Sequence, residues 1–415
     1  MKNLVICCDW INSERGDNIS NVLKFYHCLR KNESNTVQQL VYYDSGVGAP
    51  GPAGSVWVRL RENFQSTLGL ATGYRFDDSV LSAYEFLIRN YQEGDHIYLF
   101  GFSRGAYSVR TLAGLIHAVG LLSPEQANFM SSRLIAYKQC SAFEPRDFPG
   151  IAKAQNGVAL ETIGYDNLTY LTTFWPTRWP TIRMIGAWDT IANVVIPRPD
   201  RFFFPSLEEL AYTKRNPSVQ TFRQAISIDE RRCMFRLKEW DDSQIFVRDR
   251  FAQFEKLEPQ DSLQVWFAGA HADIGGGYSE AESALSKYSL LWMIEEAAKC
   301  GLSFDPQVVN QLAWGIPTEG SPFKHTPPDF AGPLHDSMTA VWRLLEFVPK
   351  SAKYQEWPER RSILGFYIPD CEPRVIPEGA IVHESVVRRM DRLSSYRPIN
   401  LPRAYGTFPL SALPR

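Results

Sequence analysis

Short apolar runs alternate with amphipathic helical patterns along this chain of 415 residues. The runs are rich in β-branched and aromatic residues, so each predicts a buried strand. They span 4–8, 40–43, 97–102, 181–188 and 263–267, and the helical patterns span 21–29, 79–91, 106–119 and 287–300. This alternation predicts an α/β fold with a mostly parallel, doubly wound sheet covered by helices on both faces.

Two intervals interrupt the alternation, at about 122–180 and 195–260, and both are rich in aromatic residues, proline and charge. We expect them to be insertions above the sheet that form a cap over a site, or that simply pack on the core. A Pro- and Gly-rich stretch at 317–333 indicates a long surface loop. The predicted organisation is therefore a catalytic domain over 1–315 and a C-terminal extension over 316–415 that packs on the same domain.

Composition narrows the class of partner. The formal net charge of −2 argues against nucleic acid, because proteins that bind it concentrate basic residues on one face. The seven cysteines are an odd number without a Cys-x-x-Cys pair, so neither a disulfide framework nor a zinc knuckle is expected. Neither a signal-peptide pattern nor a run of about 20 apolar residues occurs. We expect a cytoplasmic protein, unless a dedicated secretion system exports it folded.

The sequence Gly101-Phe102-Ser103-Arg104-Gly105 directly follows the predicted strand at 97–102 and precedes the predicted helix at 106–119. A nucleophile on a sharp strand-to-helix turn needs small residues two positions before and after it, because larger side chains collide with backbone. The turn also holds the serine at a helix N-terminus, where negative charge is favoured. Ser103 is therefore the predicted nucleophile of a serine hydrolase.

A serine nucleophile needs a histidine base and a carboxylate that orients the base. Asp189 and His271 each follow a predicted strand, so both should lie at the carboxyl edge of the sheet beside Ser103. The histidines that compete with His271 are His335 and His383, and the acids that compete with Asp189 are Asp273 and Asp336.

The oxyanion hole should use the backbone N–H of Arg104, which follows the nucleophile. A second donor is expected from the loop after the first strand, around Asp9 and Trp10. Asp9 could equally anchor that loop through hydrogen bonds of its side chain, and the sequence leaves both roles open.

With these motifs, the chain resembles the α/β-hydrolase family that contains the catalytic domains of type VI secretion phospholipase effectors. The resemblance lies mainly in 91–110 (YQEGDHIYLFGFSRGAYSVR), 186–190 (GAWDT) and 265–278 (VWFAGAHADIGGGY). It implies a triad of Ser103, Asp189 and His271 and an esterase or phospholipase activity on acyl esters, without a metal or cofactor. One departure is that the family usually has Asp-Gly-Thr-Trp-Asn after the first strand, whereas Asp9 is followed here by Trp10-Ile11-Asn12.

The predicted function is a lipolytic esterase or phospholipase that works through an acyl-enzyme, with an acyl ester or phospholipid as substrate and peripheral contact with a membrane. Two alternatives stay open. The same triad could act on a small soluble ester or thioester, or the altered loop after Asp9 could make the chain a binding protein built on a hydrolase scaffold.

Overall fold

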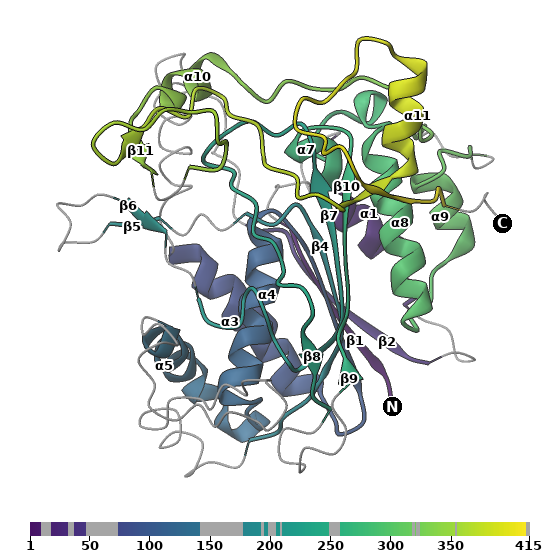
Figure 1. Ribbon diagram of the computed structural model, residues 1–415. Helices are drawn as coiled ribbons and strands as arrows, with labels where there is room; N and C mark the ends of the chain where they lie inside the picture. The colour runs from purple at the N-terminus through teal and green to yellow at the C-terminus, as the bar shows by residue number, and fades with distance from the viewer. Residues whose placement is uncertain are drawn as a thin grey trace, which may run out of the picture.

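The computed structural model describes residues 1–9, 18–31, 37–46, 74–141, 177–191, 195–197, 205–207, 210–248, 258–317, 320, 324–352 and 355–411. Within these residues a sheet of eight strands forms the centre of the molecule (Figure 1). Its strands are β1 (Asn3–Cys8), β2 (Gln39–Asp44), β3 (His96–Phe102), β4 (Ile182–Trp188), β7 (Val219–Ser227), β10 (Asp261–Phe267), β13 (Ile381–His383) and β14 (Gly406–Phe408). No helix of the described residues is long and apolar enough to cross a membrane.

The sheet has the order β2-β1-β3-β4-β7-β10-β13-β14, and every neighbouring pair is parallel. All eight carboxyl ends therefore lie at one edge, the upper edge in Figure 1. The predicted α/β class with a mostly parallel sheet is confirmed.

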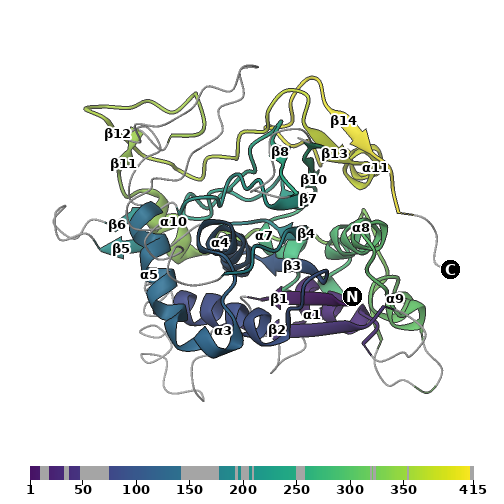
Figure 2. The same ribbon diagram turned by 90° about the horizontal axis from the view of Figure 1, so that it is seen from below.

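Helices cover both faces of the sheet. Helices α3 (Tyr74–Asn90) and α4 (Arg104–Val119) lie on one side, and α8 (Ser286–Lys299) and α9 (Pro306–Leu312) on the other (Figure 2). Helix α1 (Asn21–Cys28) packs against α8 and α9. Strand β1 is apolar from Leu4 to Cys8 because its residues alternate between two cores. Leu4, Ile6 and Cys8 join the core under α3 and α4, and Val5 and Cys7 join the core under α1 and α8.

The expectation that 195–260 is an insertion above the sheet is wrong for β7, which lies in the sheet between β4 and β10. Strand β7 was not predicted because it carries buried polar side chains and so lacks a continuous apolar run. Arg223 forms ion pairs with Glu296 at 2.6 Å and with Asp261 at 2.8 Å. Such pairing is what allows charged and polar groups to be buried in a central strand.

The described part of 122–180 includes the 3-10 helix η2 (Pro124–Phe129) and α5 (Met130–Ser141), which pack on α3 and α4. These elements lie toward the lower half of Figure 1, away from the carboxyl edge, so this part of the interval is not the expected cap. Residues 142–176 lie outside the described residues. Beside the central sheet, the part of the chain that the structure describes forms three two-stranded antiparallel pairs: β5 (Val195–Pro197) with β6 (Pro205–Leu207), β8 (Ile245–Phe246) with β9 (Glu258–Pro259), and β11 (Lys350–Ser351) with β12 (Phe366–Tyr367).

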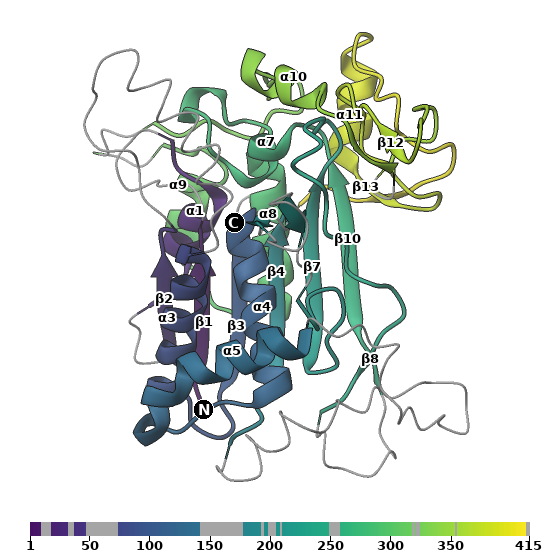
Figure 3. The same cartoon turned by 90° about the vertical axis from the view of Figure 1, so that its left-hand side faces the viewer.

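The C-terminal residues contribute to the same sheet, because β13 pairs with β10 and β14 pairs with β13. A third apolar core joins Ile226 of β7 and Trp266 of β10 to Ile376, Val382 and Val386. Val386 belongs to α11 (Glu384–Arg392). Helices α7 (His271–Gly275) and α10 (Ala340–Glu346) lie above the upper ends of β7 and β10 (Figure 3).

Candidate active site

Ser103 lies between β3 and α4 with φ of 59°, a left-handed backbone conformation that is rare for residues other than glycine. A side chain at Gly101 would collide with the backbone of Gly105 and Ala106, and one at Gly105 would collide with the carbonyl of Cys8. The predicted need for glycine on both sides of the serine is therefore confirmed. A strained non-glycine residue held this firmly is a reason to look for function.

The backbone places Ser103 beside the acid predicted from sequence. The N–H of Ser103 donates to the carbonyl of Trp188 at 3.0 Å, and Asp189 follows directly in the chain. The N–H of Asp189 donates in turn to Ala225 of β7 at 2.8 Å. The ends of β3, β4 and β7 thus run together, and both Ser103 and Asp189 are buried there.

His271 and Asp189 are in direct contact: His271 Nδ1 donates to Asp189 Oδ2 at 2.5 Å, and both side chains are buried. This bond orients the imidazole and leaves Nε2 as the nitrogen that can accept a proton. The ring packs against Phe102 at 4.6 Å and Phe235 at 5.0 Å between ring centroids. Because Phe102 directly precedes Ser103, the imidazole lies next to the strand-to-helix turn. Among the described contacts no hydrogen bond joins the Ser103 hydroxyl to His271.

A second carboxylate supports the backbone of His271. Glu230 Oε2 accepts from the His271 N–H at 3.2 Å and pairs with the guanidinium of Arg232 at 2.8 Å. The Arg232 guanidinium in turn lies 3.5 Å from the ring centroid of Phe235. Both the ring and the backbone of the histidine are therefore held by buried acidic side chains.

Sequence reasoning missed Arg374, which reaches the site from the C-terminal segment. Its guanidinium contacts both oxygens of Asp189, with Nη1 to Oδ1 at 2.5 Å and Nη2 to Oδ2 at 3.1 Å. The residue is buried at 4% exposure. No local pattern marks it, since it sits outside the predicted strands and helices in the stretch Glu372-Pro373-Arg374.

These neighbours set the protonation states of the pair. Burial by itself would raise the pKa of Asp189, but Arg374 and His271 outweigh burial and hold that pKa well below its usual range. Burial lowers the pKa of His271 from its ordinary 6.5, and Asp189 opposes this effect only in part. The site thus contains an ionised aspartate and a neutral imidazole, the states that a general base requires.

The competing residues have other partners. His335 Nδ1 binds Asp273 Oδ1 at 2.7 Å, and its ring stacks on Tyr278 at 3.6 Å. His383 is buried, with Nδ1 at 2.8 Å from the hydroxyl of Ser385. Asp336 accepts from the backbone N–H of Met338 at 2.9 Å. The described contacts therefore bring only His271 and Asp189, of the predicted bases and acids, together at the Ser103 turn.

The two proposed oxyanion donors have different surroundings. Arg104 begins α4, so its backbone N–H lies at the positive end of that helix, and burial lowers the pKa of its side chain to about 9. The N–H of Asp9 donates to Asp44 at 2.8 Å, and its carboxylate accepts from Tyr43 at 3.0 Å and from Ser20. Of the two roles that the sequence left open for Asp9, these hydrogen bonds favour the anchor. Trp10 lies outside the described residues.

Comparisons with known proteins were made for the whole chain. Residues 2–296 match the family model described as the catalytic domain of the Tle1-like phospholipase effector of type VI secretion systems. An uncharacterized protein of Saccharomyces cerevisiae is 24% identical over 436 residues, a match that covers 78% of this chain and 61% of the yeast protein. The chain thus spans less than two thirds of that relative.

Two solved structures are similar at 16% identity. One is the crystal structure of an uncharacterized protein from Pseudomonas aeruginosa, with a TM-score of 0.36 over 74% of this chain and 47% of that one. The other is the Tle1 effector bound to the VgrG spike of a type VI secretion system, with a TM-score of 0.32 over 69% of this chain and 52% of that one.

Proposed function

Because this chain belongs to the Tle1-like phospholipase effector catalytic-domain family of type VI secretion systems, we propose that it is a serine hydrolase that cleaves the carboxylic esters of lipids. The observation that carries the proposal is the buried His271–Asp189 pair beside the strained Ser103 turn. This is the arrangement of base, acid and nucleophile that acyl transfer through a serine requires.

In the proposed reaction, Ser103 Oγ attacks the ester carbonyl while His271 Nε2 takes the hydroxyl proton. The backbone N–H of Arg104 stabilises the negative charge that develops on the carbonyl oxygen. His271 then gives its proton to the leaving alcohol, and an ester of Ser103 remains. Water, deprotonated by His271, cleaves that ester and releases the fatty acid. Asp189 stays ionised throughout and stabilises the imidazolium.

Covalent labelling with a fluorophosphonate tests the nucleophile. We expect the protein to be labelled once and Ser103→Ala to lose both the label and turnover, the latter by a factor on the order of 10⁴. Ser108→Ala is the matched control, since Ser108 is also buried in α4. Absence of labelling in the unmodified protein would favour the binding-protein alternative.

Activity on a panel of acyl esters distinguishes hydrolysis of lipids from hydrolysis of small soluble esters or thioesters. A lipolytic enzyme should prefer long acyl chains presented in vesicles or micelles, because the apolar chain then contributes to binding. Higher kcat/KM on short-chain soluble esters or on thioesters would favour the alternative substrates.

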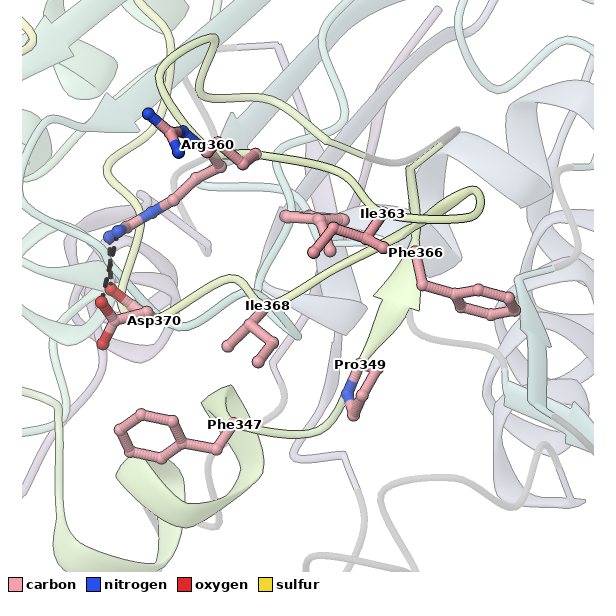
Figure 4. Close-up of a pocket in the computed structure, with 9 residues that line it drawn as sticks. Phe347, Pro349, Arg360, Ile363, Phe366, Ile368 and Asp370 are labelled. Atoms are coloured by element: carbon pink, nitrogen blue, oxygen red, sulfur yellow. Dashed lines mark hydrogen bonds and ion pairs between the residues drawn. The ribbon is translucent and has the colours of Figure 1, made fainter.

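We further propose that the protein contacts the lipid surface through an apolar lobe. This lobe consists of seven exposed side chains: Leu344, Phe347, Val348, Ile363, Leu364, Phe366 and Ile368. A pocket of about 570 Å³ opens among them, and Arg360 pairs with Asp370 at its rim (Figure 4). A group of exposed apolar side chains marks an interaction site, and the exposed Arg361, which also lines the pocket, suits lipid phosphate.

Helix α10, which carries Leu344 of the lobe, approaches the candidate active site through a short series of ring contacts. The ring of Trp342 in α10 lies 5.4 Å from that of Phe235, which lies 5.0 Å from His271. In Figure 1, α10 and β11 stand at the same edge of the sheet as α7. A membrane bound at the lobe would therefore lie on the side of the molecule to which the carboxyl edge of the sheet faces.

A further inference from the structure

Hydrogen bonds hold Arg374 in place at several points besides its contact with Asp189. Besides both oxygens of Asp189, its guanidinium donates to the carbonyls of Phe235 at 2.8 Å and Ser227 at 3.3 Å. The carbonyl of Arg374 accepts from the side chain of Asn400 at 3.0 Å. The arginine is therefore tied at both its side chain and its backbone, and has little freedom to move.

We propose that Arg374 is a positioning residue for the hydrolytic reaction: it holds the Asp189 carboxylate in the orientation that faces His271 Nδ1 and offsets part of the carboxylate's charge. This inference rests on the proposed function. Arg374 lies outside the matched residues 2–296, so the C-terminal segment would supply a working part of the active site.

The two contacts of each carboxylate oxygen explain the orientation. Oδ1 accepts from Arg374 Nη1 and from the Ser227 N–H at 3.0 Å, and Oδ2 accepts from Arg374 Nη2 and His271 Nδ1. A planar guanidinium that binds both oxygens fixes the plane of the carboxylate, which a single hydrogen bond does not. Loss of the guanidinium would leave one hydrogen bond on each carboxylate oxygen, from the Ser227 N–H and from His271 Nδ1, so the plane of the carboxylate would be held less firmly.

The charges around the His271–Asp189 pair explain how Arg374 offsets part of the Asp189 charge. His271 faces the ionised Asp189, together with Arg232 and Glu230. Arg374 faces Asp189, and more distantly Glu230 and Glu356. Without Arg374 the charge of Asp189 would act on the imidazole without compensation. The proton affinity of His271 would then rise, because removal of a nearby cation favours protonation.

Steady-state kinetics with a soluble chromogenic ester, measured against pH, tests both effects. For Arg374→Met we expect kcat to fall by a factor on the order of 10² with KM nearly unchanged, since the arginine does not touch the substrate. We also expect the acidic limb of kcat/KM to move to higher pH. Arg374→Lys keeps the charge and loses the planar fork, so the limb should return toward its original position while kcat recovers only in part.

Arg223→Met is the matched control, because Arg223 is also a buried arginine that forms ion pairs with two carboxylates, Glu296 and Asp261. This variant should leave the acidic limb in place. If Arg374→Met and Arg223→Met lower kcat alike and neither moves the limb, Arg374 is only a structural ion-pair partner and the inference is wrong. If Arg374→Met does not fold, Arg374→Lys carries the test, and unchanged kcat in that variant overturns the proposed orientation.

Titration of His271 followed by NMR separates this inference from the proposed function. A higher proton affinity in Arg374→Met than in the unmodified protein supports the inference even in a protein that hydrolyses no ester. Equal titration curves overturn the charge effect, whatever the activity.

Discussion

At the scale of single residues, burial decides what the candidate site can do. His271 and Asp189 are both removed from water, and in such surroundings an imidazole favours its neutral form while a carboxylate stays ionised only with close cationic partners. Arg374 and His271 supply that partnership for Asp189. The same pair at the protein surface would titrate like free side chains.

The pH dependence of activity follows from this environment. The neutral imidazole is the base, so activity is present above the pKa of His271 and is lost below it. Burial lowers that pKa from its ordinary 6.5. We therefore expect the acidic limb of kcat/KM to be centred below pH 6.5, as measured on a soluble ester at constant ionic strength. An acidic limb centred above 6.5 contradicts the assignment of the buried His271 as base.

The close approach of Gly105 to β1 makes a second residue-scale prediction. Gly105→Ala places a methyl group against the carbonyl of Cys8, so we expect the free energy of unfolding to fall by about 1–3 kcal/mol, as in other overpacked cores. Labelling of Ser103 should fall as well, because relief of the collision shifts the turn. Urea denaturation and labelling rates measure the two effects.

Gly94→Ala is the control for Gly105→Ala. Gly94 has a φ of 89°, but no atom lies within 4 Å of the added carbon. This control costs backbone strain alone and should leave labelling unchanged. Equal labelling in both glycine variants would mean that the Cys8 contact does not position the nucleophile.

At the scale of elements, the hairpin of β11 and β12 exposes side chains that most proteins bury. Leu364, between the two strands, is 94% exposed, and Ile363 beside it is 75% exposed. Insertion of these side chains into a lipid surface would stabilise the bound state, because burial of a leucine or isoleucine side chain contributes roughly 1.5–3 kcal/mol of favourable free energy.

Vesicle binding tests the apolar lobe. We expect the protein to sediment with anionic phospholipid vesicles and Leu364→Asp to lower the partition coefficient by roughly tenfold or more. Hydrolysis of a soluble short-chain ester should be unchanged, since Leu364 is not part of the candidate site. Ile135→Asp is the control, because Ile135 is an exposed apolar residue on α5, far from the lobe.

Two outcomes would remove the lipid-surface proposal. One is vesicle binding of Leu364→Asp equal to that of the unmodified protein. The other is no vesicle binding at all together with a dimer, seen by light scattering, that Leu364→Asp dissociates; the lobe would then bind a second copy of the chain.

At the scale of the whole molecule, the C-terminal residues belong to the same structure as the predicted catalytic region. Strand β13 extends the sheet beyond β10, and Val382 and Val386 share an apolar core with Trp266. Arg374 adds a buried ion pair with Asp189. We propose on this basis that 1–315 and 316–415 are one folding unit.

Denaturant unfolding followed by hydrogen exchange tests that unit. A single cooperative transition is expected, with amides of β10 and β13 exchanging at the same free energy, because the two strands of a single folding unit open only when the whole unit unfolds. Two separated transitions, or early exchange confined to residues after 316, contradict a single unit.

Much of the fold follows from local sequence. Strands β1, β3 and β4 could be predicted because a parallel strand covered on both faces is apolar along most of its length, as the alternation of β1 residues between two cores shows. The turn at Ser103 could be predicted because its geometry tolerates only glycine at 101 and 105. Asp189 and His271 could be selected because parallel topology brings strand ends to one edge.

Other features depend on contacts between distant residues. Strand β7 is hidden in the sequence because the partners of its buried Arg223 come from β10 and α8. The anchoring role of Asp9 depends on Ser20, Tyr43 and Asp44. Arg374 reaches Asp189 across 185 positions. The sequence by itself therefore determined the apolar strands and the nucleophile turn, where chemistry and geometry are local. Only the tertiary structure decided which buried charges meet, because a charge far along the chain is paired by the fold and not by its neighbours in sequence.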